Sequence, residues 1–325
     1  MPQILNWSDA RLVGMRNVAP DVREFEMEPV GAPWRAFPPG SHINIAVLIE
    51  DLPDHRSYSL VGSGDETYKI AVKRSEKSRG GSRYMWSLTE GARLKVTEPH
   101  NHFSLDFGKP DYLLVAGGIG ITPIISMAET LRRTGHNYRL AFANRERAGV
   151  PFHDELAAAH GEKLDLFITE EGRRIDIAKE IDRLAPDGQL YLCGPMGLLD
   201  AAKAAWKASG RPVTNLRFET FGTTGHHAPE PFMVKVPRLG REIMVSEHET
   251  MLHALAKAGI DVMSDCERGE CGLCAIDVLA CDSEIDHRDV FFNEDQRRAN
   301  DKICACVSRA IGGTLTVDTA YRPGS

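Results

Sequence analysis

Six of the seven cysteines lie in the last quarter of the 325-residue chain, and their spacing is that of a metal-binding loop. In the segment DCERGECGLC, four residues separate Cys266 from Cys271, and two separate Cys271 from Cys274. Plant-type 2Fe-2S clusters use this ligand spacing, because four thiolates must hold two bridged irons. A fourth candidate ligand, Cys306, follows in the segment ICACVSRA. The cysteines therefore predict a 2Fe-2S cluster held by Cys266, Cys271, Cys274 and Cys306.

Two alternatives to this assignment remain open from the sequence. Cys304 lies two residues before Cys306 and is able to replace it as the fourth ligand. A structural zinc site is the other reading, although zinc sites more often show two paired C-x2-4-C motifs. Gly269 and Gly272 favour the cluster, because glycines let backbone N–H groups approach the cluster sulfurs. Cys281 is expected to be a buried apolar side chain.

Two glycine turns indicate nucleotide binding. VAGGIGITP (115–123) follows a predicted strand and opens a predicted helix, where a pyrophosphate can approach the backbone. Pro123 stands where the third glycine of the dinucleotide fingerprint would fall, and it suits the first position of a helix. The second turn, LCGPMG (192–197), contains Cys193, either a packed core thiol or a residue facing a cofactor.

Two segments nearer the N-terminus join arginine to hydroxyl or glycine residues. RSYSL (56–60) and RGGSRY (79–84) each offer a guanidinium that can clamp a phosphate. The turn at 80–82 adds backbone donors to the same anion. An ordinary strand end or turn is the plainer interpretation of either segment.

The predicted secondary structure changes twice along the chain. Short strand-like runs such as HINIAVLI and ARLKVTEP, with Pro and Gly between them, predict an antiparallel barrel or sandwich over 1–108. From 109 to 226, buried strands such as YLLVAG alternate with helical patterns, as in a parallel α/β sheet. GTTGHHAPEP (222–231) resembles a linker, and 227–325 is expected to hold a hairpin, a helix, the cysteine loop and a closing strand.

Composition excludes several classes of protein. A net charge of −7, from 39 basic and 46 acidic side chains, is wrong for a nucleic-acid binder. The N-terminus has no signal-peptide pattern, and the longest apolar stretch, 112–128, is broken by glycines and a proline and is not a membrane span. An odd number of closely spaced cysteines fits free or metal-bound thiols in the cytoplasm.

Taken in order, these motifs resemble the phthalate dioxygenase reductase family, within the ferredoxin–NADP reductase-like superfamily. The resemblance covers nearly the whole chain, and its most specific parts are the domain order and the final pair of motifs. It implies an antiparallel β-barrel flavin domain, an α/β parallel-sheet nicotinamide domain and a C-terminal β-grasp ferredoxin domain. The motifs that carry it are Arg56-Ser57-Tyr58-Ser59, Arg79-Gly80-Gly81-Ser82, the 117–123 turn, Cys193-Gly194-Pro195, FETFG (218–222), the cysteine loop, DHRD (286–289) and CVSRA (306–310).

The resemblance also implies roles for residues of these motifs. FMN would be bound by Arg56, Tyr58 and Ser59, with phosphate contacts from Arg56 and the 79–82 turn, and NADH would bind at the two glycine turns. Phe221 would lie beside the flavin ring with Glu219 and Thr220 nearby, and the residues at the reacting atoms would be Ser59, Cys193 and Phe221. The full cofactor-binding set is Arg56, Ser57, Tyr58, Ser59, Arg79, Gly80, Gly81, Ser82, Gly118, Gly120, Thr122, Pro123, Cys193, Gly194, Pro195, Glu219 and Phe221.

The choice of nucleotide is less well determined by the residues. FMN rather than FAD rests on the resemblance. Arg145 and Arg147 follow a predicted strand, where they could meet the 2′-phosphate of NADPH, and a solvated loop is the interpretation we favour for them.

The expected function is a reductase that splits a hydride into single electrons. NADH gives two electrons at once and a 2Fe-2S cluster accepts one, so a flavin must stand between them. The resemblance points to a separate Rieske-type oxygenase or demethylase as the acceptor, met transiently near Glu267, Arg268 and Glu270. DHRD is expected to fix the loop after the cluster by ion pairing. A cytochrome or a quinone-like acceptor is one alternative, and a non-enzymatic zinc-bearing module is another.

Overall fold

The computed structural model describes residues 6–49, 52–62, 66–75, 80–221 and 227–320. The chain divides into two compact units, Leu5–Glu219 and Thr220–Ser325. Arg79 and His226 lie outside the described residues. Within the described part of the chain, no helix combines the length and the apolar character needed to cross a membrane.

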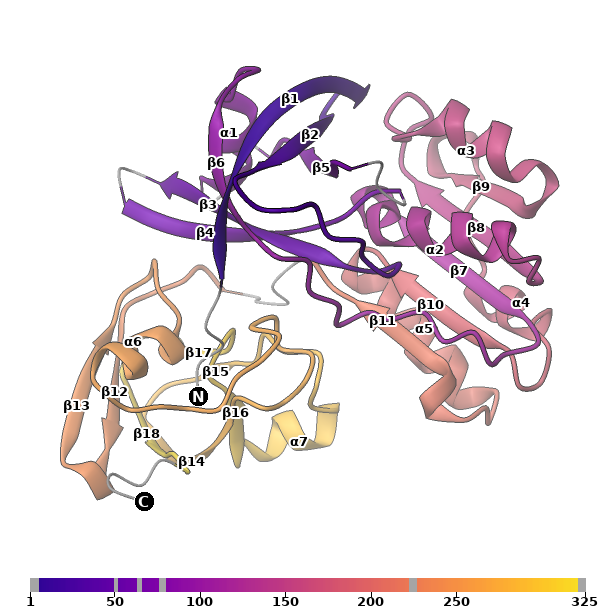
Figure 1. The fold of residues 1–325 in the computed structure, drawn as a ribbon. Helices are drawn as coiled ribbons and strands as arrows, with labels where there is room; N and C mark the ends of the chain where they lie inside the picture. The colour runs from indigo at the N-terminus through magenta and orange to yellow at the C-terminus, as the bar shows by residue number, and fades with distance from the viewer. Residues whose placement is uncertain (1–5, 50–51, 63–65, 76–79, 222–226, 321–325) are drawn as a thin grey trace. The chain divides into compact units, whose positions relative to one another are not determined.

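The first unit begins with a six-stranded antiparallel sheet in the order β4-β3-β6-β1-β2-β5 (Figure 1). A bridge between Leu60 and Ile70 joins its two ends, so the sheet closes into the predicted barrel. Helix α1 (Gly81–Ser87) lies between β5 and β6 in sequence. The strands are β1 (Trp7–Ala19), β2 (Val22–Val30), β3 (His42–Ile49), β4 (Leu52–Ser59), β5 (Tyr68–Lys73) and β6 (Arg93–Thr97).

The second part of this unit is a parallel sheet in the order β11-β10-β7-β8-β9. Its central strand β7 (Tyr112–Gly117) is buried along its whole length, as expected for a strand covered on both faces. The order of the strands reverses between β7 and β10 (Gln189–Cys193), which is where ligands bind in open α/β sheets. The remaining strands are β8 (Tyr138–Asn144), β9 (Leu164–Ile168) and β11 (Leu216–Glu219).

Four helices accompany this sheet: α2 (Ile121–Arg133), α3 (His153–His160), α4 (Ile177–Asp182) and α5 (Met196–Ala208). Helix α2 begins two residues before Pro123, so this proline occupies the first turn rather than the predicted first position. A proline fits there because N–H groups in the first turn have no partner within the helix. Short 3-10 turns are η1 (Gly118–Gly120), η2 (Gly161–Lys163), η3 (Thr169–Glu171) and η4 (Val213–Asn215).

One hydrophobic core spans the barrel and the parallel sheet. Val22, Val61 and Phe103 from the barrel side belong to the same buried cluster as Ile124 and Met127 of α2. Separately, the interior of the barrel has its own core. The shared core explains why the two predicted N-terminal modules form one compact unit.

The second unit is a mixed sheet in the order β13-β12-β18-β14-β16, with β12 and β18 parallel and the other pairs antiparallel. The predicted hairpin, helix and closing strand are confirmed, whereas the short helix α7 (Glu294–Ala299) was not foreseen. The other elements are β12 (Phe232–Val236), η5 (Pro237–Leu239), β13 (Arg241–Val245), α6 (Met251–Lys257), β14 (Ala275–Cys281), β15 (Ile285–Asp286), β16 (Lys302–Cys304), β17 (Arg309–Ala310) and β18 (Thr314–Asp318).

Arg309 is expected to be a main source of stability for the second unit. Its buried guanidinium donates hydrogen bonds to the carbonyl oxygens of Glu230, Ser246 and Glu249. Arg309→Met leaves these acceptors unpaired and should lower the free energy of unfolding by about 3 kcal/mol. Hydrogen exchange of the β12 and β18 amides measures this loss. Arg298→Met is the control, because Arg298 is largely exposed and should change stability by less than about 0.5 kcal/mol; equal effects of the two substitutions would refute the assignment.

Candidate functional site

The backbone of the cysteine loop is shaped to surround a sulfur. Glu267, Gly269 and Gly272 all have positive φ angles, of 49°, 73° and 74°. As a result, the N–H groups of Arg268, Glu270 and Cys271 each lie 3.4 Å from Cys266 Sγ. A concave set of N–H donors of this kind binds anions and favours a thiolate at Cys266, but burial is the larger effect and raises the pKa of this thiol to about 11.

The other thiols of the loop crowd one another in a buried space. Cys274 Sγ lies 3.1 Å from Cys306 Sγ. Hydrogen bonds from the thiols of Cys304 and Cys306 lower the pKa of Cys274 to about 3, and the same contact together with burial raises the pKa of Cys306. One ionised sulfur therefore opposes ionisation of the next, and a set of thiolates here requires positive charge among them. The two irons of a 2Fe-2S cluster supply that charge, so this donor set fits the cluster.

The sulfurs do not surround a single point. Among the residues that the structure describes, no group of three or more Cys, His, Asp or Glu side chains is close enough to hold one metal ion. Cys304 is fully buried in β16, where it pairs with Ala275, and it contacts Cys274 as Cys306 does. Both candidates for the fourth ligand therefore reach the same neighbour.

The DHRD and CVSRA segments support the cysteine loop through hydrogen bonds and close packing. Asp289 accepts hydrogen bonds from the Ser308 hydroxyl (3.2 Å) and the Phe292 N–H (2.8 Å), and the Val290 N–H donates to Gly269 O (3.0 Å). A Cβ on Gly269 would lie 2.8 Å from Asp289 Cα, so only glycine fits this contact. The neighbouring residues Asp286 and Arg288 form a buried ion pair at 2.8 Å. This ion pair lies within DHRD itself, and the contacts with the cysteine loop are a hydrogen bond and close packing, so the prediction that DHRD fixes the loop after the cluster by ion pairing stays a prediction.

The exposed residues of the cysteine loop differ from those predicted for the partner surface. Glu267 is exposed, but the side chains of Arg268 and Glu270 are only 16% and 12% exposed and pair with each other at 3.4 Å. Instead, two apolar side chains are exposed near the cysteines, Leu273 at 46% and Phe291 at 47%. The Phe291 ring packs directly on Gly272, where an added Cβ would lie 2.3 Å from the ring.

The two glycine turns predicted for the nucleotide lie side by side at the carboxyl ends of β7 and β10. A Cβ on Gly120 would lie 2.2 Å from Cys193 O, and one on Gly117 would lie 2.4 Å from Pro195 Cδ. Gly118, in contrast, has a φ of 53° and open space where its Cβ would be. The structure thus brings Gly118, Gly120, Cys193, Gly194 and Pro195 together at the point where the order of strands reverses. Thr122 and Pro123 follow in the first turn of α2.

A cavity of about 640 Å³ is lined by the ends of β8 and β9, the segments that follow them and the first turns of α5. Its wall includes Gly197 and Phe167 with both basic and acidic side chains, among them Arg145 and Glu170. Arg147 forms two hydrogen bonds with the Glu171 carboxylate, at 2.5 and 2.7 Å. Its charge is thus paired within the chain, and the solvated-loop role of Arg145 and Arg147 stays a prediction.

The predicted flavin motif lies at the end of β4. Arg56 Nη1 is 2.6 Å from Asp54 Oδ2, and the Arg56 side chain passes over Gly81, where an added Cβ would lie 2.8 Å from Arg56 Cγ. The Ser57 hydroxyl donates to Asn44 Oδ1 at 2.5 Å, and burial raises the pKa of Tyr58. Gly80 precedes α1, and Ser82 lies in its first turn. Arg56 therefore contacts Gly81, a described residue of the predicted phosphate turn at 79–82.

Two partners in this region were missed from the sequence. Asp54 lies two residues before Arg56 on the same strand, and this period-two spacing places both side chains on one face. Such spacing was a signal that the sequence already contained. Asn44 is opposite Ser57 on the adjacent strand, and only the pairing register reveals that contact.

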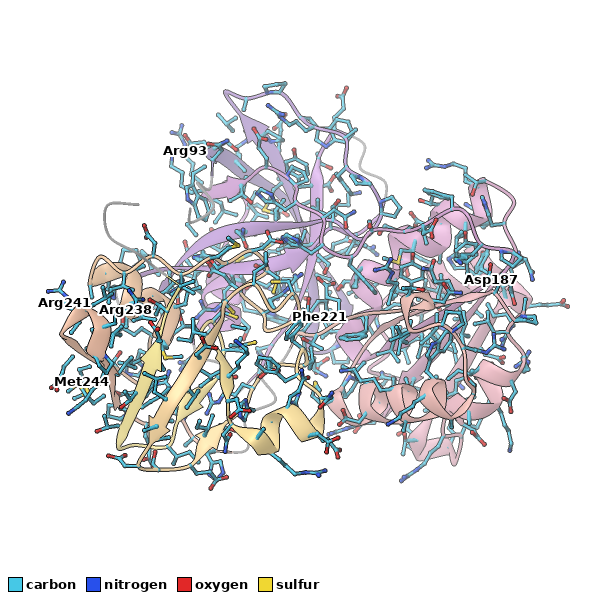
Figure 2. All side chains as sticks on the ribbon, turned by 90° about the horizontal axis from the view of Figure 1, so that it is seen from below. Arg93, Asp187, Phe221, Arg238, Arg241 and Met244 are labelled. Atoms are coloured by element: carbon cyan, nitrogen blue, oxygen red, sulfur yellow. The ribbon has the colours of Figure 1, made fainter. Side chains whose placement is uncertain are left out.

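Glu219 ends β11 in register with Cys193, and both are buried. Phe221, labelled in Figure 2, belongs to the second unit and is 46% exposed. Thr220, between them, is buried and donates hydrogen bonds from its N–H and hydroxyl to Glu270 Oε1.

Serine substitutions should separate the two candidate fourth ligands. We expect Cys306→Ser to abolish the visible absorbance of the cluster, because a serine hydroxyl is a poor substitute for a thiolate at iron. Cys304→Ser is the matched control and should leave iron content and absorbance unchanged. Loss of the cluster in Cys304→Ser with retention in Cys306→Ser would reverse the assignment.

Gly120 should tolerate no side chain. In Gly120→Ala the new Cβ meets the backbone of Cys193, and overpacking of this kind costs about 1–3 kcal/mol. We expect the Kd for NADH to rise about tenfold or more. Gly14→Ala is the control, because its Cβ would make ordinary contacts at 3.5 Å. Unchanged NADH binding in Gly120→Ala, measured by fluorescence titration, would contradict the placement of the nucleotide.

Comparisons with known proteins agree with this geometry. Residues 234–310 match the family model of the 2Fe-2S iron-sulfur cluster binding domain, and residues 114–204 match that of the oxidoreductase NAD-binding domain. The chain is 33% identical to phthalate dioxygenase reductase of Burkholderia cepacia over 98% of its own length and 99% of the relative. It is 33% identical to vanillate O-demethylase oxidoreductase of Acinetobacter baylyi, covering 94% of this chain and 97% of that one.

The fold is also that of a solved structure described as phthalate dioxygenase reductase, a modular structure for electron transfer from pyridine nucleotides to 2Fe-2S. The TM-score is 0.80 at 32% identity, over 96% of this chain and 98% of that chain. The chain therefore belongs to the phthalate dioxygenase reductase family, and it is an NADH-dependent oxidoreductase with FMN and a 2Fe-2S cluster as its cofactors.

Proposed function

We propose that this protein is the reductase component of a two-component Rieske-type oxygenase or demethylase that acts on an aromatic acid or a related amine. The end-to-end match to phthalate dioxygenase reductase carries this proposal, because it includes both compact units. The sequence itself has no C-x-H motif of a Rieske centre. We propose a separate oxygenase, which receives electrons from the cluster.

The residues of the first unit bind and orient the two nucleotides. Bound FMN accepts a hydride and releases its electrons singly. In our proposal, Arg56 and the turn at Gly80, Gly81 and Ser82 hold the FMN phosphate, and Tyr58 and Ser59 contact its ring. The Arg56–Asp54 pair supports this role by fixing the guanidinium in one orientation over Gly81.

The nicotinamide nucleotide is proposed to bind over Gly118, where the backbone is open. Its pyrophosphate would meet the turn at Gly120 and the N-terminus of α2, where unpaired N–H groups favour an anion. Cys193 would contact the nicotinamide ring, and Glu219, which pairs in register with Cys193 at the end of β11, would lie beside it.

Four cysteines are proposed as cluster ligands: Cys266, Cys271, Cys274 and Cys306. The three N–H groups at Cys266 Sγ support the proposal, since such bonds stabilise thiolate ligands and influence the cluster potential. We also assign the protein to the cytoplasm, because none of the seven cysteines, all of which lie in the described residues, forms a disulfide, and a reducing compartment favours free or metal-bound thiols.

The oxygenase is proposed to dock over Leu273 and Phe291. Leu273 lies between two of the proposed ligands, and Phe291 covers the adjacent Gly272, so both exposed side chains lie close to the cluster. Small, partly apolar contacts are typical of transient redox partners. Arg268 and Glu270 pair with each other and are mostly covered. Of the three polar residues expected at this surface, Glu267 is the exposed one.

Reconstitution with a purified Rieske oxygenase of an aromatic acid tests this function. We expect the NADH-reduced protein to support turnover, and Phe291→Ser to raise the KM for the oxygenase about tenfold, since aromatic anchors dominate such interfaces. NADH-driven reduction of ferricyanide by the same variant should stay unchanged. Leu279→Ser, on the exposed side of β14, is the control.

Two results would count against the proposal. Rapid electron transfer to a cytochrome, with none to Rieske oxygenases, would favour the other acceptor class. An unchanged KM in Phe291→Ser would exclude this docking surface.

A further inference from the structure

Glu270 lies in the cysteine loop, and its carboxylate is directed into the protein. Its Oε1 accepts hydrogen bonds from the Thr220 N–H at 2.7 Å and from the Thr220 hydroxyl at 2.9 Å. Its Oε2 lies 3.4 Å from Arg268 Nη2, and its side chain is only 12% exposed. Hydrogen bonds to an ionised carboxylate are stronger than neutral ones, so this is a firm attachment.

The main chain of the same residue contacts the cluster-binding sulfur. The Glu270 N–H lies 3.4 Å from Cys266 Sγ, next to the N–H of Arg268. Glu270 therefore contacts a proposed cluster ligand with its backbone and Thr220 with its side chain. The side chain of Glu270 thus links Thr220 to this part of the loop.

Thr220 occupies a special position in the chain. It is the first residue of the second unit and follows Glu219, the last residue of β11, which pairs in register with Cys193 of the nucleotide turn. Thr220 is 4% exposed, whereas the next residue, Phe221, is 46% exposed. Glu270 thus holds the chain at the residue where it enters the second unit.

We propose that Glu270 is a positioning residue for electron transfer into the cluster, acting through its two hydrogen bonds to Thr220. Loosening this attachment lets the loop around Cys266 move, which slows the step that delivers electrons to the cluster. The inference rests on the proposed ligand set and on the reductase function. It assigns to Glu270 a role that differs from that of the exposed Glu267 in the same loop.

Charge is the competing explanation, because a carboxylate near the cluster also lowers its midpoint potential. Thr220→Val separates the two effects, since it removes one of the two hydrogen bonds and leaves every charge in place. Glu270→Gln removes the charge and retains an oxygen acceptor for Thr220. Glu267→Gln is the matched control, because Glu267 loses the same charge in the same loop but pairs with His253 rather than Thr220.

The experiment uses the cofactor-loaded full-length protein in anaerobic stopped flow, with hydrogen exchange and redox potentiometry on the same samples. Loss of a hydrogen bond to a charged group should lower the exchange protection of the amides around residue 220 about tenfold in Thr220→Val. Reduction of the cluster should slow severalfold in this variant, while reduction of the flavin by NADH and the midpoint potential of the cluster stay unchanged. Glu267→Gln should match the wild type in cluster reduction and exchange.

Unchanged exchange and unchanged cluster reduction in Thr220→Val would overturn the proposal. A potential shift in Glu270→Gln, with Thr220→Val silent, would also overturn it and assign Glu270 to charge tuning. If NADH fails to reduce the cluster of the wild-type protein, the reductase function itself is refuted, and this outcome is separate from a failure of the Glu270 proposal.

Discussion

The three cofactor regions depend on one constraint, which is close approach of the backbone at glycine. At Gly81 the missing side chain gives room to Arg56, at Gly120 to the carbonyl of Cys193, and at Gly272 to the ring of Phe291. In each case a Cβ would lie less than 3 Å from its neighbour. At the cysteine loop, the groups that contact Cys266 Sγ are backbone N–H groups, whose positions are set by the fold.

The two compact units carry different parts of the electron-transfer pathway. The first unit joins a barrel and a parallel sheet through a shared core, and this fixes the flavin motif and the glycine turns within one body. The second unit surrounds its thiols with a loop of positive φ angles and supports that loop from the DHRD and CVSRA segments. A hydride acceptor and a one-electron acceptor are thereby built on separate scaffolds in a single chain.

Much of this arrangement is predictable from the sequence, because the informative signals are local. The strand run YLLVAG, the glycine turn after it and the cysteine spacing each identify their own structure. Strands β1 and β2 were less evident, since in β1 only Ala10 and Leu12 are fully buried and its polar residues hide the pattern. The exposure of Arg268 and Glu270 was predicted wrongly, because Glu270 is held by Thr220, 50 residues away in sequence, and Arg268 pairs with Glu270. Long-range hydrogen bonds of this type leave no local pattern.

The central claim is that electrons from NADH pass through the flavin to a 2Fe-2S cluster in this chain. Anaerobic titration of the purified protein with NADH, followed by low-temperature EPR and optical spectroscopy, tests it most directly. The account predicts iron and no zinc, bleaching of the flavin bands and a growing EPR signal of a reduced 2Fe-2S cluster. Bleaching of the flavin without any cluster signal, or zinc in place of iron, would contradict it.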